Sequence, residues 1–293
     1  MDLHLEGKVV ILTGGFKGIG KGVALQLAKE GTIVAVINRD DGTAEQFDAE
    51  MKAITDNYRT YLMDLNDTDD IALIVEDVVK TYGHIDGLVN NAGRNDNLDL
   101  DHTSWREFEQ SLHGNLTHYY ELAHRCAPYL RESKGAIVNI SSKTALTGQG
   151  KTSAYAAAKG AILGLTREWA AAFAKDDVRV NAIVVSEAFT PLYAKWIATF
   201  GDEGGPARAA RQDHLSHPAR PPHDQRRGDR ERGRVPAVQL LLAHHRPMGV
   251  RGRRLRPPRP RPRVTGGTMD ALNTRVRDDG DDFDVIDAHL WTL

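Results

Sequence analysis

The sequence of 293 residues contains a single cysteine, Cys126, and only short apolar runs. One cysteine excludes a disulfide within the chain and is typical of a reducing compartment. No run approaches the roughly 20 apolar residues that a membrane helix needs. The N-terminus also lacks the basic, apolar and small-residue pattern of a signal peptide. We therefore expect a cytoplasmic protein without a membrane partner.

Neither sign of charge dominates, because 38 Lys and Arg residues face 40 Asp and Glu residues. This balance gives no reason to expect a nucleic-acid partner, so a small-molecule substrate is the partner we expect. His113, His118 and His124 show no metal-ligand spacing with acidic residues, and we expect no metal. With 41% hydrophobic residues, the chain can form the core of one large α/β domain.

Proline and lysine divide the chain into two parts. Proline is scarce before Pro191, where only Pro128 occurs, whereas arginine and proline crowd residues 206–263 and no lysine follows Lys195. We therefore expect a single folded domain over residues 1–200. Residues 201–293 form an atypical Arg/Pro-rich tail, either poorly ordered or derived from a frameshift.

A short apolar run at residues 8–13 leads directly into a glycine-rich turn and then a helical stretch. Strand, glycine-rich turn and helix in this order are typical of a dinucleotide site. Glycines let the backbone approach the pyrophosphate, which lies at the helix N-terminus. The residues that we expect to hold the cofactor in this turn are Gly14, Lys17, Gly18, Ile19 and Gly20.

The second expected strand, residues 33–37, ends at Asn38 and Arg39. An acid here would hold the ribose 2′-hydroxyl of NAD, whereas an arginine accommodates the 2′-phosphate of NADP. Lys17 could supply a second cation to that phosphate, although two aspartates after Arg39 could partly cancel both charges. We favour NADP as the cofactor and leave NAD open.

Strands and helices continue to alternate as far as residue 185. Further strands are expected at residues 60–63, 88–93, 135–140 and 179–185, with helices at 68–82, 104–113, 115–130 and 155–174. Such alternation predicts an α/β fold with a doubly wound parallel sheet of the Rossmann type, covered on both faces by helices. Residues after the third and fourth strands are expected to contact the cofactor, namely Asp64, Leu65, Asn91, Ala92 and Gly93.

Tyr155 and Lys159 are one helical turn apart, so their side chains share a helix face. A neighbouring ammonium favours phenolate over phenol, so we expect the pKa of Tyr155 to fall from about 10 toward neutral pH. Such a tyrosine could exchange a proton with an alcohol or carbonyl oxygen, and Ser142 could hydrogen-bond the same oxygen. Asn115 is a poor helix former in an expected helix, which suggests a role for its side chain.

Together with the segments TGGFKGIG and NNAG, these four residues make residues 1–200 resemble the classical short-chain dehydrogenase/reductases. The resemblance implies that Tyr155 donates and accepts the proton, and that Lys159 tunes it and binds the ribose. It also implies that Ser142 stabilises the substrate oxygen, that Asn115 anchors a proton-relay water, and that Thr190 holds the nicotinamide carboxamide. Hydride would then pass between the nicotinamide and a carbinol or carbonyl carbon.

A closer likeness is to the L-fucose dehydrogenase branch, through stretches such as GLVNNAGRND, NLTHYYELAH and TPLYAKWIATF. It implies a hydroxylated sugar as substrate, whose hydroxyl groups need polar partners in the pocket. The lining residues would be Asn95, Ser142, Gln149, Tyr155, Glu187, Tyr193 and Trp196. The alternatives are a reductase of 3-oxoacyl or steroid-type ketones, and a nucleotide-binding protein impaired by its tail. The sequence departs from the family at Val185-Ser186, where Pro-Gly or Pro-Ala is frequent.

The tail lacks the helix, seventh strand and T-G-x-x-x-x-V-D-G-G segment of that family. Residues 244–260, HHRPMGVRGRRLRPPRP, can be encoded by codons that give ITGQWVFVDGGYVHLDR when read one nucleotide out of frame. We therefore hypothesise that the chain is frameshifted from about residue 201. The family usually forms a homotetramer through its C-terminal elements, so this ending should leave the sixth strand at an exposed edge and hinder assembly. A basic tail that binds nucleic acid is the alternative interpretation.

Overall fold

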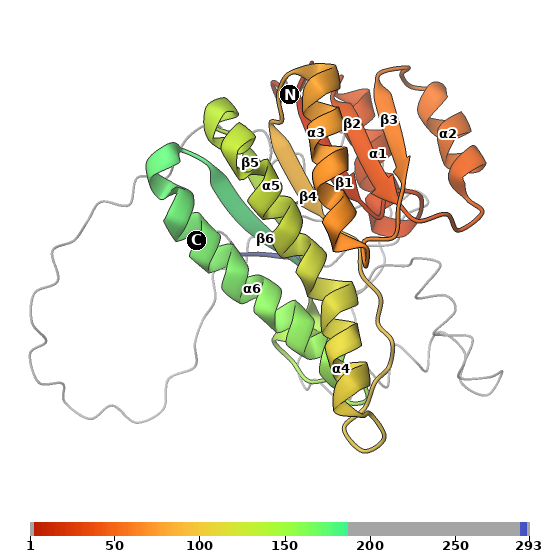
Figure 1. The fold of residues 1–293 in the computed structure, drawn as a ribbon, viewed down its shortest axis with the longest axis vertical. Coiled ribbons are helices and arrows are strands. Elements are labelled where there is room, and N and C mark those ends of the chain that lie inside the picture. Colours follow the sequence, from red (N-terminus) through yellow and green to blue (C-terminus); the bar gives the residue numbers. More distant parts are fainter. Residues whose placement is uncertain (1–2, 187–287, 292–293) are drawn as a thin grey trace, which may run out of the picture.

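A computed structural model describes residues 3–186 and 288–291 of the chain (Figure 1). The expectations for Glu187, Thr190, Tyr193 and Trp196, and for nearly all of the tail, lie outside the described residues. The elements in chain order are β1 (Val9–Thr13), α1 (Gly18–Lys29), β2 (Ile33–Asn38), α2 (Ala44–Lys52), β3 (Tyr58–Leu62), α3 (Ile71–Tyr82), β4 (Gly87–Asn90), α4 (Trp105–Leu112), α5 (His118–Ser133), β5 (Ala136–Ser142), α6 (Ser153–Phe173), β6 (Arg179–Val185) and β7 (Ala288–Trp291).

The strands form one seven-stranded sheet in the order β3-β2-β1-β4-β5-β6-β7. All pairings from β3 to β6 are parallel. The chain runs outward from β1 to β3 and then returns to place β4 on the other side of β1. The strand order therefore reverses at β1 and β4, and doubly wound folds bind their ligands at the carboxyl ends of the strands beside such a reversal. The predicted doubly wound Rossmann-type fold is confirmed.

The prediction that β6 would be an exposed edge strand is wrong. β7 pairs antiparallel with β6, from Ala182 opposite Trp291 to Val185 opposite Ala288. An open strand edge presents backbone N–H and C=O groups that gain from pairing, and a segment near the C-terminus pairs with them here. The pairing reaches only the last four of the seven residues of β6.

Two apolar clusters lie on the two faces of the sheet, because successive side chains of a strand point to opposite sides. Val10 and Leu12 of β1 join the cluster that includes residues of α1 and α2. Val9 and Ile11 join the cluster that includes residues of α3, α5 and α6, which Figure 1 shows across one face of the sheet. Burial on both faces explains why the central strands β1 and β2 are nearly continuous apolar runs.

The helix predicted at residues 115–130 begins later in the structure, because α5 starts at His118. A π-helical turn, His113–Thr117, joins α4 to α5, and Pro128 lies inside α5. A π-helical turn widens the backbone spiral by one residue and is frequent at functional sites. Here it contains Asn115. None of the helices in the described ranges is long and apolar enough to cross a membrane.

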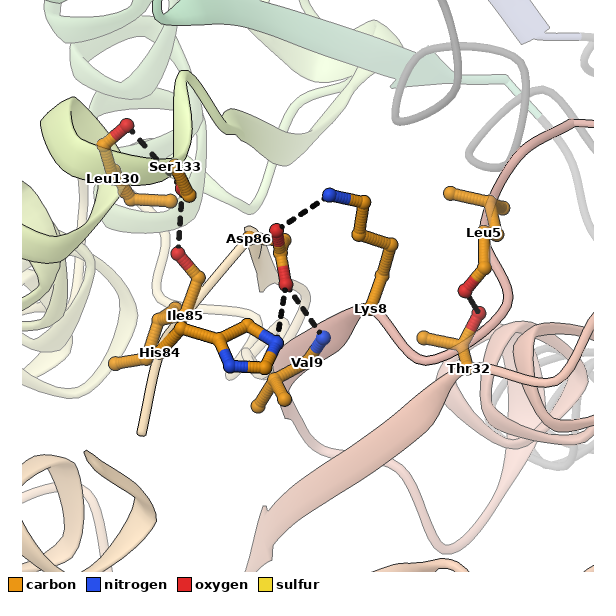
Figure 2. A network of polar contacts seen from close by, with 9 residues as sticks. All are labelled: Leu5, Lys8, Val9, Thr32, His84, Ile85, Asp86, Leu130 and Ser133. Atoms are coloured by element: carbon orange, nitrogen blue, oxygen red, sulfur yellow. Dashed lines mark hydrogen bonds and ion pairs between the residues drawn. The ribbon is translucent and has the colours of Figure 1, made fainter. Parts of the chain in front are cut away.

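Asp86 forms hydrogen bonds that link neighbouring strands at the amino-terminal end of the sheet (Figure 2). Its carboxylate accepts hydrogen bonds from Nζ of Lys8 and from the backbone N–H of Val9, both at 2.9 Å. Its backbone carbonyl accepts from the N–H of Ala136 at 3.0 Å, so one residue links the beginnings of β1, β4 and β5. A shallow hollow at this end includes Lys8 and Asp86 in its lining. It lies opposite the carboxyl ends of the strands, where the predicted site residues gather.

Candidate active site

The turn between β1 and α1 depends on its glycines. Gly14 and Gly18 have positive φ angles of 69° and 59°, a conformation that glycine adopts without steric cost. A Cβ atom on Gly20 would lie 2.0 Å from the carbonyl oxygen of Gly14, so no larger residue fits there. The turn therefore brings the N-terminus of α1 next to the carboxyl end of β1. This arrangement fits the pyrophosphate of a dinucleotide.

Asn91 fastens the carboxyl end of β4 to this turn. Its Nδ2 donates to the carbonyl oxygens of Thr13 and Gly14 at 2.9 and 3.0 Å. In return, Oγ1 of Thr13 accepts from the backbone N–H groups of Asn91 and Ala92 at 2.9 and 3.0 Å. The predicted cofactor residues of the two turns are thus held side by side at the point where the strand order reverses.

Gly93 brings this turn against two of the four predicted catalytic residues. A Cβ atom on Gly93 would lie 3.1 Å from Oδ1 of Asn115 and 3.3 Å from Nζ of Lys159. The Asn115 side chain is 2% exposed; it accepts from the N–H of Arg94 at 2.7 Å and donates to the carbonyl of Ser111 at 3.0 Å. Both ends of its amide therefore bind the protein and hold the β4–α4 connection against the π-helical turn. The relay role of Asn115 stays a prediction.

Ser142 and Tyr155 are joined by a hydrogen bond between their side chains. Ser142 ends β5, and its hydroxyl accepts from the N–H of Thr144 at 3.3 Å, which begins the short 3-10 turn Lys143–Ala145. Tyr155 lies in the first turn of α6 and forms a side-chain hydrogen bond with Ser142. The strand end and the helix start thus place two hydroxyl groups where a single substrate oxygen could contact both.

Lys159 is almost completely buried, with 2% of its surface exposed. Its Nζ donates to the hydroxyl of Tyr119 at 3.1 Å and to the carbonyl of Ile140 at 2.8 Å. The same atom lies 5.6 Å from the centroid of the Tyr155 ring. Burial lowers the pKa of Lys159 to about 7. The ammonium is therefore near Tyr155, but its hydrogen bonds go to other groups.

The prediction that Lys159 would lower the pKa of Tyr155 is wrong. Burial raises the pKa of Tyr155 to about 12; the hydrogen bond with Ser142 lowers it, and the charge of Asp96 raises it further. The sequence argument counted the ammonium and omitted the cost of removing a phenolate from water. At neutral pH Tyr155 is therefore a phenol, the form that donates a proton.

The residues expected to select the cofactor have partners of their own. Asn38 is buried; its Nδ2 donates to the carbonyl of Arg39 at 2.7 Å and its Oδ1 accepts from the N–H of Phe16 at 3.5 Å. Lys17 forms an ion pair of 2.5 Å with Asp41, which offsets part of its charge. Arg39 is exposed at the end of β2. Asn38 thus braces the glycine turn, and Arg39 is the more available cation.

The other predicted contacts are more peripheral. Asp64 is exposed and accepts two hydrogen bonds from Asn66, and Leu65 is half-buried beside it. Asn95 accepts from the backbone N–H of Asn97 at 3.1 Å. Gln149 is exposed. Their contacts with cofactor or substrate stay predictions.

The sequence assigned no part in the site to one half-buried acid and two buried residues that lie near it. One oxygen of Asp96, Oδ1, is buried and has no hydrogen-bond partner among the described residues. Tyr119 is fully buried against Lys159. His118 is also buried, and burial lowers its pKa to about 3. The sequence did contain a signal for His118 and Tyr119, because they lie about one helical turn after Asn115.

Comparison with known proteins gives consistent relatives. The family model for short chain dehydrogenases matches residues 8–199. An L-fucose dehydrogenase from Bos taurus is 32% identical over 219 residues, which cover 74% of this chain and 78% of the relative. A 3-oxoacyl-(acyl-carrier-protein) reductase from Thermotoga maritima is 32% identical over 194 residues, covering 66% and 79%. The crystal structure of Cj0485 dehydrogenase aligns with a TM-score of 0.67 and 46% identity, covering 73% of this chain and 80% of that one.

The matched region contains both cofactor turns and the Ser142, Tyr155 and Lys159 group. The fold, the two glycine turns and the relatives thus all indicate the same family. The chain belongs to the short-chain dehydrogenase family, and it is an oxidoreductase that acts on CH–OH groups with a nicotinamide nucleotide.

Proposed function

We propose that the protein transfers hydride between NADP and a carbinol or carbonyl carbon of a sugar such as L-fucose. Tyr155 exchanges a proton with the substrate oxygen, and Ser142 hydrogen-bonds the same oxygen. Lys159 keeps a positive charge beside the phenol and binds the ribose, while Asn115 anchors a relay water. The nicotinamide, when bound, donates or accepts the hydride. The hydrogen bond between Ser142 and Tyr155 supports these roles, as does the 5.6 Å distance from Lys159 to the Tyr155 ring.

Asp96 is the observation that favours a sugar. Its Oδ1 is buried without a partner in the described part of the chain, and its charge acts on Tyr155, so it lies near the reacting oxygen. A carboxylate oxygen removed from water needs a hydrogen-bond donor. A hydroxyl group next to the reacting carbon of a sugar supplies that donor. The hydrocarbon next to the carbonyl of a steroid-type ketone does not.

The substitution Asp96→Asn should therefore lower kcat/KM for sugars by about 10-fold or more, since hydrogen bonds to charged groups contribute about 1.5–3 kcal/mol. Turnover of a simple alcohol or ketone without neighbouring hydroxyl groups should not fall in this way, because the lost charge acts there only on the pKa of Tyr155, which that charge raises. Asp101→Asn is the matched control, because Asp101 lies in the same connection and is exposed. An equal loss for every substrate would contradict a role for Asp96 in recognising hydroxyl groups.

A 3-oxoacyl reductase is the second candidate, and the Thermotoga maritima relative supports it at 32% identity. The experiment that separates the two is a substrate panel of aldoses, 3-oxoacyl thioesters and steroid ketones, followed by nicotinamide absorbance. The greatest kcat/KM for an aldose supports the proposal, and the greatest kcat/KM for a thioester overturns it. Nucleotide binding without turnover of any substrate would indicate a protein impaired by its C-terminal segment.

Preference for NADP depends chiefly on Arg39. Because Lys17 is paired with Asp41, Arg39 is the cation at the end of β2 with more charge available for a 2′-phosphate. Arg39→Ala should weaken NADPH binding by about 10-fold and leave NADH binding nearly unchanged, as measured by nucleotide fluorescence titration. Lys29→Ala is the control, because Lys29 is exposed at the opposite end of α1. Equally weakened binding of NADPH and NADH would show that Arg39 does not bind the 2′-phosphate.

A further inference from the structure

Tyr119, Ile140 and Lys159 form a closed triangle of hydrogen bonds behind the site. The hydroxyl of Tyr119 donates to the carbonyl of Ile140 at 3.0 Å. Nζ of Lys159 donates to that hydroxyl at 3.1 Å and to the same carbonyl at 2.8 Å. The three residues come from α5, β5 and α6, and each is at most 5% exposed. Water therefore does not compete for these bonds.

The direction of these bonds matters for the charge of Lys159. A tyrosine hydroxyl has one hydrogen, and this hydrogen is donated to Ile140. Toward Lys159 the oxygen of Tyr119 therefore acts as an acceptor. An acceptor binds an ammonium more strongly than a neutral amine. Tyr119 thus opposes burial, which lowers the pKa of Lys159 to about 7.

Lys159 is also fixed at its backbone end. Oγ of Ser141 donates to the carbonyl of Lys159 at 2.9 Å, which ties this part of α6 to β5. At the other end, Nζ lies 5.1 Å from the ring centroid of Tyr119 and 5.6 Å from that of Tyr155. With both ends held, the ammonium stays between the two tyrosines.

We propose that Tyr119 is a positioning residue, which keeps the Lys159 side chain charged and directed toward Tyr155. The inference rests on the proposed function of Lys159 as the residue that tunes Tyr155. It assigns to α5 a part in catalysis that acts only through Lys159. Tyr119 itself does not contact the reacting atoms.

The other groups around Lys159 do not replace this effect. His118, on the same helix as Tyr119, is buried with a pKa of about 3 and stays neutral between pH 5 and 9. Asn115 lies close by and does not titrate. Asp96 acts from the β4–α4 connection on Tyr155. Among the described residues, Tyr119 is therefore the side chain that accepts a hydrogen bond from Nζ.

The substitution Tyr119→Phe tests the proposal. It keeps the ring and removes only the oxygen, and the carbonyl of Ile140 keeps its bond from Lys159. The readout is the titration of Lys159 by NMR of the full chain with ¹³C-labelled lysine, with the signal assigned through Lys159→Met. The titration midpoint should fall by about one pH unit or more. Tyr61→Phe is the control; it loses a tyrosine hydrogen bond of 2.7 Å to Asp77, away from the site, and should leave the midpoint unchanged.

Turnover supplies the second readout. In Tyr119→Phe the alkaline limb of the kcat profile should move to lower pH, and kcat at pH 8 should fall about 10-fold. An unchanged titration midpoint of Lys159 in Tyr119→Phe would overturn the proposal. It would also be overturned if Tyr119→Phe and Tyr61→Phe lowered stability equally and neither changed the pH profile of kcat. Tyr119→Met, which fills the space without a hydroxyl, serves the same titration if the phenylalanine variant does not fold. Because the NMR titration needs neither cofactor nor substrate, its failure is distinct from a wrong substrate assignment.

Discussion

Tyr155→Phe should lower turnover by about 10³-fold, since a positioned acid or base contributes about 10² to 10⁴ in rate. The phenylalanine ring keeps the contacts of α6 and removes only the hydroxyl that hydrogen-bonds Ser142. Nucleotide binding and the melting temperature should therefore stay close to those of the unchanged protein. Turnover is measured in both directions with the best substrate of the panel.

The two directions should differ in their response to pH. Burial raises the pKa of Tyr155 to about 12, so the phenol needed for reduction is present at neutral pH. Oxidation needs the phenolate, so its rate should rise with pH until Lys159 loses its proton. Tyr120→Phe is the control, because Tyr120 is 53% exposed on α5. Hydride transfer at the original rate in Tyr155→Phe would refute the mechanism.

Much of this site could be predicted because its signals are local. Gly14, Gly18 and Gly20 follow directly after an apolar strand, and each meets a requirement of a tight turn into a helix. Tyr155 and Lys159 share a face because four residues make about one helical turn. Six parallel strands were predicted, and β1 to β6 lie in one sheet with parallel pairings.

What the sequence could not supply depends on contacts between distant segments. The pKa of Tyr155 rises because the folded chain buries its phenol, a cost that no spacing reveals. Tyr119 follows Asn115 by four residues, but its hydrogen bond with Lys159 depends on how α5 packs against α6, which no local spacing reveals. The pairing of β7 with β6 joins residues more than a hundred positions apart, and nothing local predicts it.

We further propose that residues 1–200 form the catalytic domain and that a frameshift produced the segment from about residue 201. The edge of β6 offers a direct test, because β7 pairs with Ala182–Val185 and leaves the first three residues of β6 unpaired with it. The shifted reading contains VFVDGG, an apolar run that suits a parallel strand along β6. The connection after β6 also contains Glu187 and Thr190, which are predicted to contact substrate and cofactor. A misplacement of such groups by about 1 Å can cost about 10² in rate.

Replacing the segment from about residue 201 with the shifted reading should therefore raise turnover by about 10²-fold and produce a tetramer. The melting temperature should rise by roughly 10 °C, because a longer strand partner and subunit contacts stabilise the folded state. Light scattering after size-exclusion chromatography gives the assembly, and nicotinamide absorbance gives turnover. The restored chain with Tyr155→Phe is the control and should stay inactive, since the gain must act through the same phenol. A tetramer with full turnover from the unaltered protein would contradict the frameshift, as would a gene whose own reading frame encodes a natural Arg/Pro-rich domain.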